Sequence, residues 1–264
     1  MEQHFSCNYR SPGHPAGAFL SLRFYLSLAG IMYRAGRIAA AGNYNAERWV
    51  YDSFLVGRLM ERIGAPVVIE GVENLDIEGP CVFESNHMST LETFFLPCII
   101  QPRKDVTFVV KKSLLKYPCL GPVLASRDPL ALGRTNPRED LTIVLEGGMK
   151  HLSAGRSVII FSQGSRRPDV KTEDFNTLGV KLARKAKVPV IPIALKTDAW
   201  GEGSLIKDMG KITPSLPVHV RFGAPVDIKG PGKEEHAAIV NFIKTSFDEW
   251  AAADGKAGGG IIDI

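Results

Sequence analysis

From residue 65 onward, short runs rich in β-branched residues alternate with longer segments of helical periodicity, and this alternation limits the possible folds. The predicted strands are 66–70, 81–84, 106–110, 157–161, 188–195 and 217–222. The predicted helices are 90–100, 137–153, 177–187 and 233–250, the second of which begins with the N-cap pair Asn136-Pro137. Strands alternating with helices in this way are typical of an α/β fold with a largely parallel central sheet flanked by helices.

We therefore predict one α/β domain over residues 65–250, preceded by a helical element in residues 1–64 and followed by a flexible Gly-rich tail, 251–264. The 264 residues are 45% hydrophobic, which is enough apolar side chain for a core and excludes the disordered and collagen-like classes. The four cysteines lack the spacing of a zinc site, so we interpret them as free thiols in a reducing compartment and expect no metal; they are Cys7, Cys81, Cys98 and Cys119.

Residues 17–62 have the pattern of two amphipathic helices separated near residues 42–45. The apolar residues of these helices are Phe19, Leu22, Leu26 and Tyr33 in the first and Trp49, Phe54, Leu55, Leu59 and Ile63 in the second. Basic amphipathic helices that carry aromatic residues are typical of proteins lying on an anionic membrane surface, although a helical hairpin packed on its own core has the same pattern. The apolar run 24–33 is far shorter than the roughly 20 residues that cross a bilayer, so we expect a peripheral protein.

Positive charge is concentrated in the middle of the chain. Residues 101–196 hold 18 Lys and Arg against 8 Asp and Glu, a net charge of +10, whereas the whole chain has a net charge of +4. Such a segment predicts either an anionic partner or a solvated basic face. Nucleic acid is a poor candidate for that partner, because the basic residues lack an aromatic stacking pattern or a recognised nucleic-acid motif.

The first polar segment of chemical interest spans residues 84–92, where a predicted strand ends and a helix begins. Active sites of α/β proteins form at such carboxyl ends of strands. His87 is of a type often used as a general base, and Glu92 meets it only if His87 precedes the helix and Glu92 lies in the first helical turn. Ser89 and Glu92 also have the spacing of a helix capping box, which explains the acid without catalysis.

Further candidate residues follow other predicted strands. The segment 161–167 combines Gly164 and Ser165 with Arg166, and a glycine turn beside an arginine suits a phosphate group. Lys111 and Lys112 follow the strand 106–110, and Arg134 follows another apolar run; the cations are Lys111, Lys112 and Arg134. Taken one at a time, these cations are better explained as surface charges than as ligand contacts.

Taken together and in order, these segments resemble the glycerolipid acyltransferases of the lysophosphatidate acyltransferase type. The four matching blocks are N-H-x4-acid at 86–92, K-x-x-L-x-x-x-P-x-x-G at 111–121 with G-R at 133–134, F-x-x-G-S-R at 161–166, and V-P-x-I-P at 188–192. The resemblance implies transfer of a fatty acyl group from acyl-CoA or acyl-carrier protein to a lysophospholipid hydroxyl. It also implies a peripheral position at the cytoplasmic face of an anionic membrane, and no cofactor beyond the thioester co-substrate.

The resemblance also assigns roles to residues. His87 is implied as the general base, oriented by Glu92. The acceptor phosphate is implied to contact one of two lysines and several residues of the other blocks, namely Lys111 or Lys112, Arg134, Gly164, Ser165 and Arg166. The fourth block, 188–192, is apolar and is implied to be structural or to line the acyl site.

Two departures from the family pattern bear on the substrate. Glu92 stands where the family usually has Asp, and Ser162-Gln163 replaces the usual Pro-Glu before Gly164. The expected acceptor is 1-acyl-glycerol 3-phosphate. The alternatives are glycerol 3-phosphate, a lyso-aminolipid or a lipid A precursor as acceptor, or a non-catalytic lipid-binding protein that keeps the fold.

Overall fold

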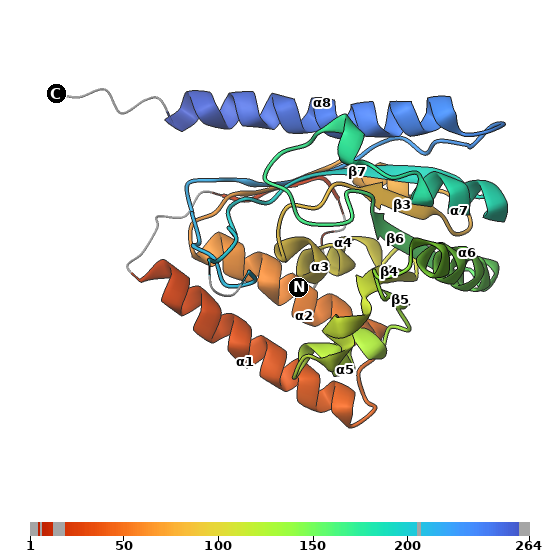
Figure 1. The fold of residues 1–264 in the computed structure, drawn as a ribbon. Coiled ribbons are helices and arrows are strands. Elements are labelled where there is room, and N and C mark those ends of the chain that lie inside the picture. The colour runs from red at the N-terminus through yellow and green to blue at the C-terminus, as the bar shows by residue number, and fades with distance from the viewer. Residues whose placement is uncertain (1–4, 6, 13–18, 205–206, 259–264) are drawn as a thin grey trace.

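A computed structural model describes residues 5, 7–12, 19–204 and 207–258. Within this part a β-sheet lies at the centre of the molecule (Figure 1). The sheet has eight strands in the order β1-β2-β8-β7-β3-β6-β4-β5. The strands are β1 (Tyr9–Arg10), β2 (Val67–Glu70), β3 (Val82–Ser85), β4 (Val106–Lys111), β5 (Leu130–Leu132), β6 (Ser157–Phe161), β7 (Val190–Lys196) and β8 (Val218–Phe222).

The sheet is largely parallel, which confirms the predicted α/β class. The parallel pairs are β2 with β8, β3 with β6 and β7, and β4 with β5 and β6. Among the strands of the described chain, only β1 with β2 and β7 with β8 pair antiparallel with each other. The six predicted strands are all present; β1 and β5 were not predicted, because runs of two and three residues carry no readable alternation.

Helices cover both faces of the sheet (Figure 1). They are α1 (Leu20–Ala40), α2 (Ala46–Arg62), α3 (Leu91–Phe95), α4 (Pro97–Ile100), α5 (Leu120–Ala125), α6 (Pro137–Ser153), α7 (Leu178–Ala186) and α8 (Lys233–Gly258). Helices α6, α7 and α8 pack against one face, in a core cluster that includes Val82 and Ile160. Helices α1 to α5 pack against the other face, in a cluster that includes Phe83 and Ile159.

Two predicted helices need correction. The single helix predicted over 90–100 is two short helices, α3 and α4, because Pro97 begins a new helix and supplies no amide hydrogen to continue the old one. The prediction of a flexible tail from residue 251 is wrong for residues 251–258, because α8 continues to Gly258. Trp250 is buried and Asp254 forms an ion pair with Lys196 at 2.6 Å, so this end of α8 is fastened to β7. The rest of the predicted tail, 259–264, lies outside the described residues.

The two N-terminal helices occupy different environments. Trp49 and Leu59 of α2, and Ile63 just after it, are buried in the core and do not face a membrane, whereas Phe54 and Leu55 are partly buried, so a membrane-facing surface on this helix is not confirmed. In α1 the predicted face is exposed, with fractional exposures of 80% for Phe19 just before the helix, 58% for Leu22, 66% for Leu26 and 60% for Tyr33. No helix among the described residues is long and apolar enough to cross a membrane.

Candidate active site

A cavity of about 1080 Å³ opens beside the carboxyl ends of β3, β4, β5 and β6. Six of the predicted site residues line it, namely His87, Lys111, Arg134, Gly164, Ser165 and Arg166. Two do not: Glu92 is fully buried next to His87, and Lys112 is exposed in the short 3-10 helix η2 (Lys112–Lys116) outside the lining. The structure therefore brings together residues that the sequence spreads over 80 positions.

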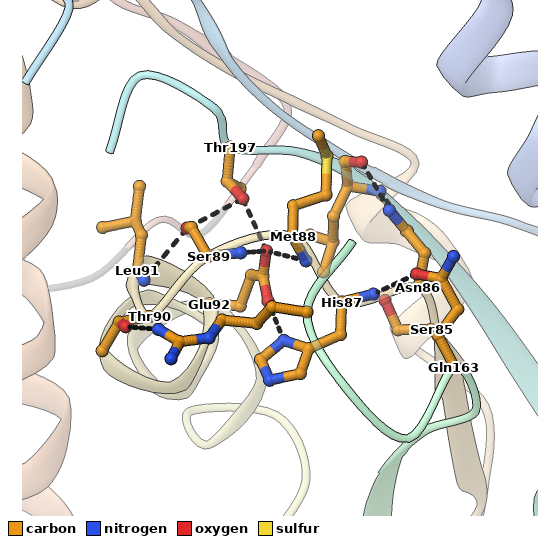
Figure 2. Close-up of polar contacts among 12 residues, drawn as sticks. Ser85, Asn86, His87, Met88, Ser89, Thr90, Leu91, Glu92, Gln163 and Thr197 are labelled. Atoms are coloured by element: carbon orange, nitrogen blue, oxygen red, sulfur yellow. Dashed lines mark hydrogen bonds and ion pairs between the residues drawn. The ribbon is translucent and has the colours of Figure 1, made fainter. Parts of the chain in front are cut away.

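His87 and Glu92 form a directly bonded pair. His87 follows β3, and Glu92 lies in the first turn of α3, so the intervening turn lets the two side chains meet (Figure 2). Nδ1 of His87 contacts Oε2 of Glu92 in a short hydrogen bond. A carboxylate at Nδ1 holds the proton there and leaves Nε2 with a free lone pair, which is the arrangement a general base needs.

The other oxygen of Glu92 has separate partners (Figure 2). Oε1 accepts the backbone N–H of Met88 at 2.9 Å, the N–H of Ser89 at 2.8 Å and the hydroxyl of Thr197 at 2.5 Å. The bond to Ser89 is the contact that a capping box makes. The geometry is compatible with both interpretations of Glu92, since one oxygen binds backbone amides just before α3 while the other binds the histidine.

Three further contacts orient His87. Its ring stacks on Phe161, with centroids 4.3 Å apart and 16° between the planes. Its backbone N–H donates to Oε1 of Gln163 at 2.8 Å, and its carbonyl accepts the N–H of Arg167 at 2.8 Å. Gln163 is itself fixed, because its amide donates to the carbonyl of Asp169 at 3.1 Å. The His87 side chain keeps 17% exposure, which leaves one edge open to the cavity.

The cations of the site differ in how they are held. Arg166 donates to Thr90 and forms ion pairs with Asp208 at 2.6 Å and Glu202 at 3.3 Å. Arg134 has a positive φ of 59°, and the Asp140 carboxylate stabilises this turn by accepting the Arg134 N–H at 3.0 Å. The Lys111 side chain is exposed at the end of β4. These three residues place positive charge on several sides of one cavity.

The rest of the cavity has an apolar wall. Its residues come from α3, β4, α5 and β5 and include Phe94, Phe108, Val110, Leu120, Leu124 and Leu132. The fourth sequence block, 188–192, lies at the start of β7 and contributes no lining residue, which favours its structural interpretation. A cavity with cations and a histidine next to an apolar wall suits a ligand that has both an anionic head and a hydrocarbon chain.

No buried cysteine of the described chain fits the role of a nucleophile here. Cys81 lies near His87 in sequence but is fully buried at the start of β3, where burial raises its pKa to about 12. Burial also raises the pKa of Cys98 well above its usual range. Both thiols therefore stay protonated at neutral pH, and neither lines the cavity.

Several side chains of the site were not predicted from the sequence as site residues. They are Thr90, Phe161, Thr197, Glu202 and Asp208. Thr197 directly follows β7, so the rule that active sites gather at the carboxyl ends of strands was a signal that pointed to it. Glu202 and Asp208 lie in the connection between β7 and β8, and no local pattern indicates that this connection reaches Arg166.

Comparison with known proteins identifies the family of the chain. Residues 66–196 match the protein family described as Acyltransferase. The 1-acyl-sn-glycerol-3-phosphate acyltransferase of Pseudomonas aeruginosa is 32% identical over 233 residues, which cover 84% of this chain and 86% of that protein. A chloroplastic protein of the same name from Brassica napus is 33% identical over 128 residues, or 48% of this chain and 36% of its own length.

The fold also resembles a solved structure. The crystal structure of PlsC from Thermotoga maritima, a 1-acyl-sn-glycerophosphate acyltransferase, matches with a TM-score of 0.66 and 24% sequence identity. The match covers 88% of this chain and 95% of that one. At this level of identity the likeness concerns the fold, including the largely parallel sheet.

Proposed function

This chain belongs to the glycerolipid acyltransferase family, of the 1-acyl-sn-glycerol-3-phosphate acyltransferase type, and from that premise we propose the reaction, the acceptor and the roles of the site residues. The enzyme is an acyltransferase of phospholipid biosynthesis. The acceptor we propose is 1-acyl-glycerol 3-phosphate, and the donor is an acyl-CoA or acyl-carrier-protein thioester. The observation that carries the proposal is the bonded pair of His87 and Glu92 on a cavity that also holds Arg166.

In the proposed mechanism His87 is the general base. Its Nε2 accepts the proton of the acceptor hydroxyl while the hydroxyl oxygen forms a bond to the thioester carbonyl carbon. Glu92 stabilises the imidazolium that results. When the tetrahedral intermediate collapses, the carbon–sulfur bond breaks and the imidazolium returns its proton to the departing thiolate. The products are an ester and a free thiol, and the step draws on no cofactor beyond the thioester.

We assign the phosphate of the acceptor to the cations of the cavity. Arg166 supplies a planar fork of N–H donors that matches a phosphate, and Lys111 and Arg134 add positive charge from the ends of β4 and β5. Gly164, with a positive φ of 69°, forms the turn that brings Ser165 and Arg166 to the cavity. Lys111 fits this role better than Lys112, which lies outside the lining.

The proposal is tested by incubating the purified chain with palmitoyl-CoA or palmitoyl-carrier protein and a panel of acceptors. The panel holds lysophosphatidate, glycerol 3-phosphate, a lyso-aminolipid and a lipid A precursor, and products are identified by mass spectrometry. We expect phosphatidate from lysophosphatidate. Faster acylation of another acceptor would overturn the acceptor assignment, and the absence of product with every pair would favour a lipid-binding protein without catalysis.

We also propose that α1 rests on an anionic membrane at its cytoplasmic face. The exposed residues Phe19, Leu22, Leu26 and Tyr33 form an apolar strip on one helix, and the exposed Arg23 and Arg37 lie on the same helix. Leu26→Asp is expected to weaken binding to phosphatidylglycerol vesicles in a flotation assay, whereas Ser27→Asp adds the same charge at an exposed polar position and has a smaller effect. Equal effects of the two substitutions would contradict a specific apolar contact.

A further inference from the structure

The guanidinium of Arg166 is already occupied by two carboxylates. Asp208 Oδ1 lies 2.6 Å from its Nη1, and Glu202 Oε1 lies 3.3 Å from its Nε. Thr90 completes the cluster, because its hydroxyl lies 2.9 Å from the same oxygen of Asp208. All four side chains line the cavity that His87 faces. Arg166, which we propose holds the acceptor phosphate, is thus already paired with two carboxylates of the protein itself.

The position of Asp208 is determined by contacts outside the cavity. The indole N–H of Trp200 donates to the Asp208 carbonyl at 3.1 Å, and the hydroxyl of Tyr25 in α1 donates to the Gly210 carbonyl at 2.5 Å. The N–H of Ile212 donates to Ser21 of α1 at 3.2 Å. The backbone around Asp208 is therefore bonded both to its own connection and to α1. Because these hydrogen bonds fix the backbone around Asp208, they also hold its carboxylate next to Arg166.

Arg166 and its two acidic partners differ in how easily each can move out of the ion pairs. Arg166 is 17% exposed, so leaving its charge without an anion would be costly. Asp208 and Glu202 are 37% and 45% exposed, so each carboxylate can rotate toward solvent without movement of the backbone. The exchangeable partners of this ion pair are therefore the two acids, and the arginine stays in place.

We propose that Asp208, assisted by Glu202, occupies Arg166 in the place of the acceptor phosphate, and that the acceptor binds by exchanging a carboxylate for its phosphate. This inference rests on the proposed function, in which Arg166 holds that phosphate. A guanidinium binds carboxylate and phosphate through the same N–H donors, so the two anions compete for it. The competition lowers affinity for the acceptor and leaves the reaction at His87 untouched.

A different role for Asp208 makes the opposite prediction. If Asp208 stayed in place to orient Arg166 while the acceptor was bound, its removal would weaken acceptor binding. The sign of the change in affinity therefore separates an occupant of the site from a positioning residue.

The test is Asp208→Asn, which removes the charge and keeps the shape. Affinity for lysophosphatidate is measured by calorimetry without the acyl donor, and KM and kcat are measured with it. We expect Kd and KM for the acceptor to fall about twofold to fivefold, with kcat and the thioester KM unchanged. Glu202→Gln is expected to give a smaller fall, because Glu202 is farther from Arg166 and more exposed.

Two controls make the result specific. Asp198→Asn makes the same change in the same connection, but Asp198 pairs with Lys196 at 3.0 Å, so acceptor affinity should not change. In an Arg166→Ala background, Asp208→Asn should lose its effect. Thermal unfolding of each variant verifies that the fold is intact.

An acceptor Kd that rises or stays unchanged in Asp208→Asn, while Arg166→Ala weakens binding, overturns the exchange and keeps the proposed function. Binding that is unaffected by Arg166→Ala overturns both the exchange and the assignment of the phosphate to Arg166. Calorimetry reports binding even if no acyl transfer is observed, so failure of the reaction and failure of the exchange are distinguishable.

Discussion

Two Glu–His pairs start from the same strand and differ in what they are built to do. Glu84 lies within β3 and faces His236 of α8, whereas His87 follows β3 by two residues and binds Glu92 of α3. In both pairs the glutamate side chain is fully buried and the histidine side chain is 17% exposed. Burial and residue type therefore do not distinguish the two pairs.

The surroundings of the acids do distinguish them. Glu92 accepts bonds from two backbone amides, from Thr197 and from His87. Neither oxygen of Glu84 has a hydrogen-bond partner in the described chain, and its nearest cation, Nδ1 of His236, is 3.5 Å away. His87 lines the large cavity and His236 does not. A catalytic pair needs a satisfied acid and an open imidazole, and only the first pair has both.

Of the substitutions that distinguish the two pairs, Glu92→Gln is expected to cause the largest loss of activity. A Gln amide that donates to Nδ1 of His87 forces the proton onto Nε2, so the base is lost although the shape is kept. We expect kcat to fall by about 10²-fold to 10⁴-fold, measured with saturating donor and acceptor. Activity within fivefold of the unchanged enzyme would show that Glu92 only caps α3.

A smaller effect on the same pair is expected for Thr197→Val, which removes the hydroxyl that donates to Glu92 with little change in volume. A hydrogen bond to a charged group contributes about 1.5–3 kcal/mol, and only a share of this is felt in the transition state, so we expect kcat to fall by roughly tenfold. Steady-state kinetics measure the fall, and the midpoint of thermal unfolding controls for general destabilisation. An unchanged kcat would place Thr197 outside the catalytic network.

The second pair is expected to affect stability alone. Glu84 raises the pKa of His236 above its ordinary value of 6.5, partly offset by burial. A raised pKa in the folded state means that the protonated histidine stabilises the fold fully below pH 6.5, and that this contribution is lost as the pH rises through the raised pKa. Relative to the unchanged enzyme, His236→Gln should therefore have a lower free energy of unfolding at pH 6, with a smaller difference at pH 9.

Urea unfolding of the two proteins across this pH range measures that difference, and kcat should be unchanged. A difference that grows as the pH rises would contradict the ion pair. Because His151 and His219 are present in both proteins, their own titrations cancel when the two curves are compared.

Much of the fold could be predicted because its strands and helices follow from patterns of residues that are close in the sequence. The strand 157–161 and the helix 137–153 have the predicted bounds, the latter because Asn136 caps its first turn. Contacts between distant segments could not be predicted. Nothing near Asp208 in sequence indicates that it meets Arg166, and nothing near Trp49 indicates that its helix is covered by α1 and the core.

The site, like the fold, could be predicted only in part: the sequence indicated the candidate residues but not the contact that each one makes. His87 and Glu92 have a spacing that a turn can bring together, but the same spacing suits a capping box, and sequence offers no way to see that each oxygen has its own role. Lys111 and Lys112 are adjacent, and only the end of β4 determines that the first of them lines the cavity. The family resemblance indicated which sequence blocks form the site, and the structure showed that Lys111, not Lys112, lines the cavity.

The role of His87 as the base is tested most directly by measuring acyl transfer by His87→Ala and His236→Ala in parallel, with palmitoyl thioester and lysophosphatidate as substrates. We expect His87→Ala to lose about 10²-fold to 10⁴-fold in kcat while remaining folded, and His236→Ala to keep its kcat within about twofold. A His87→Ala variant that turns over at the rate of His236→Ala would contradict the assignment of His87 as the base.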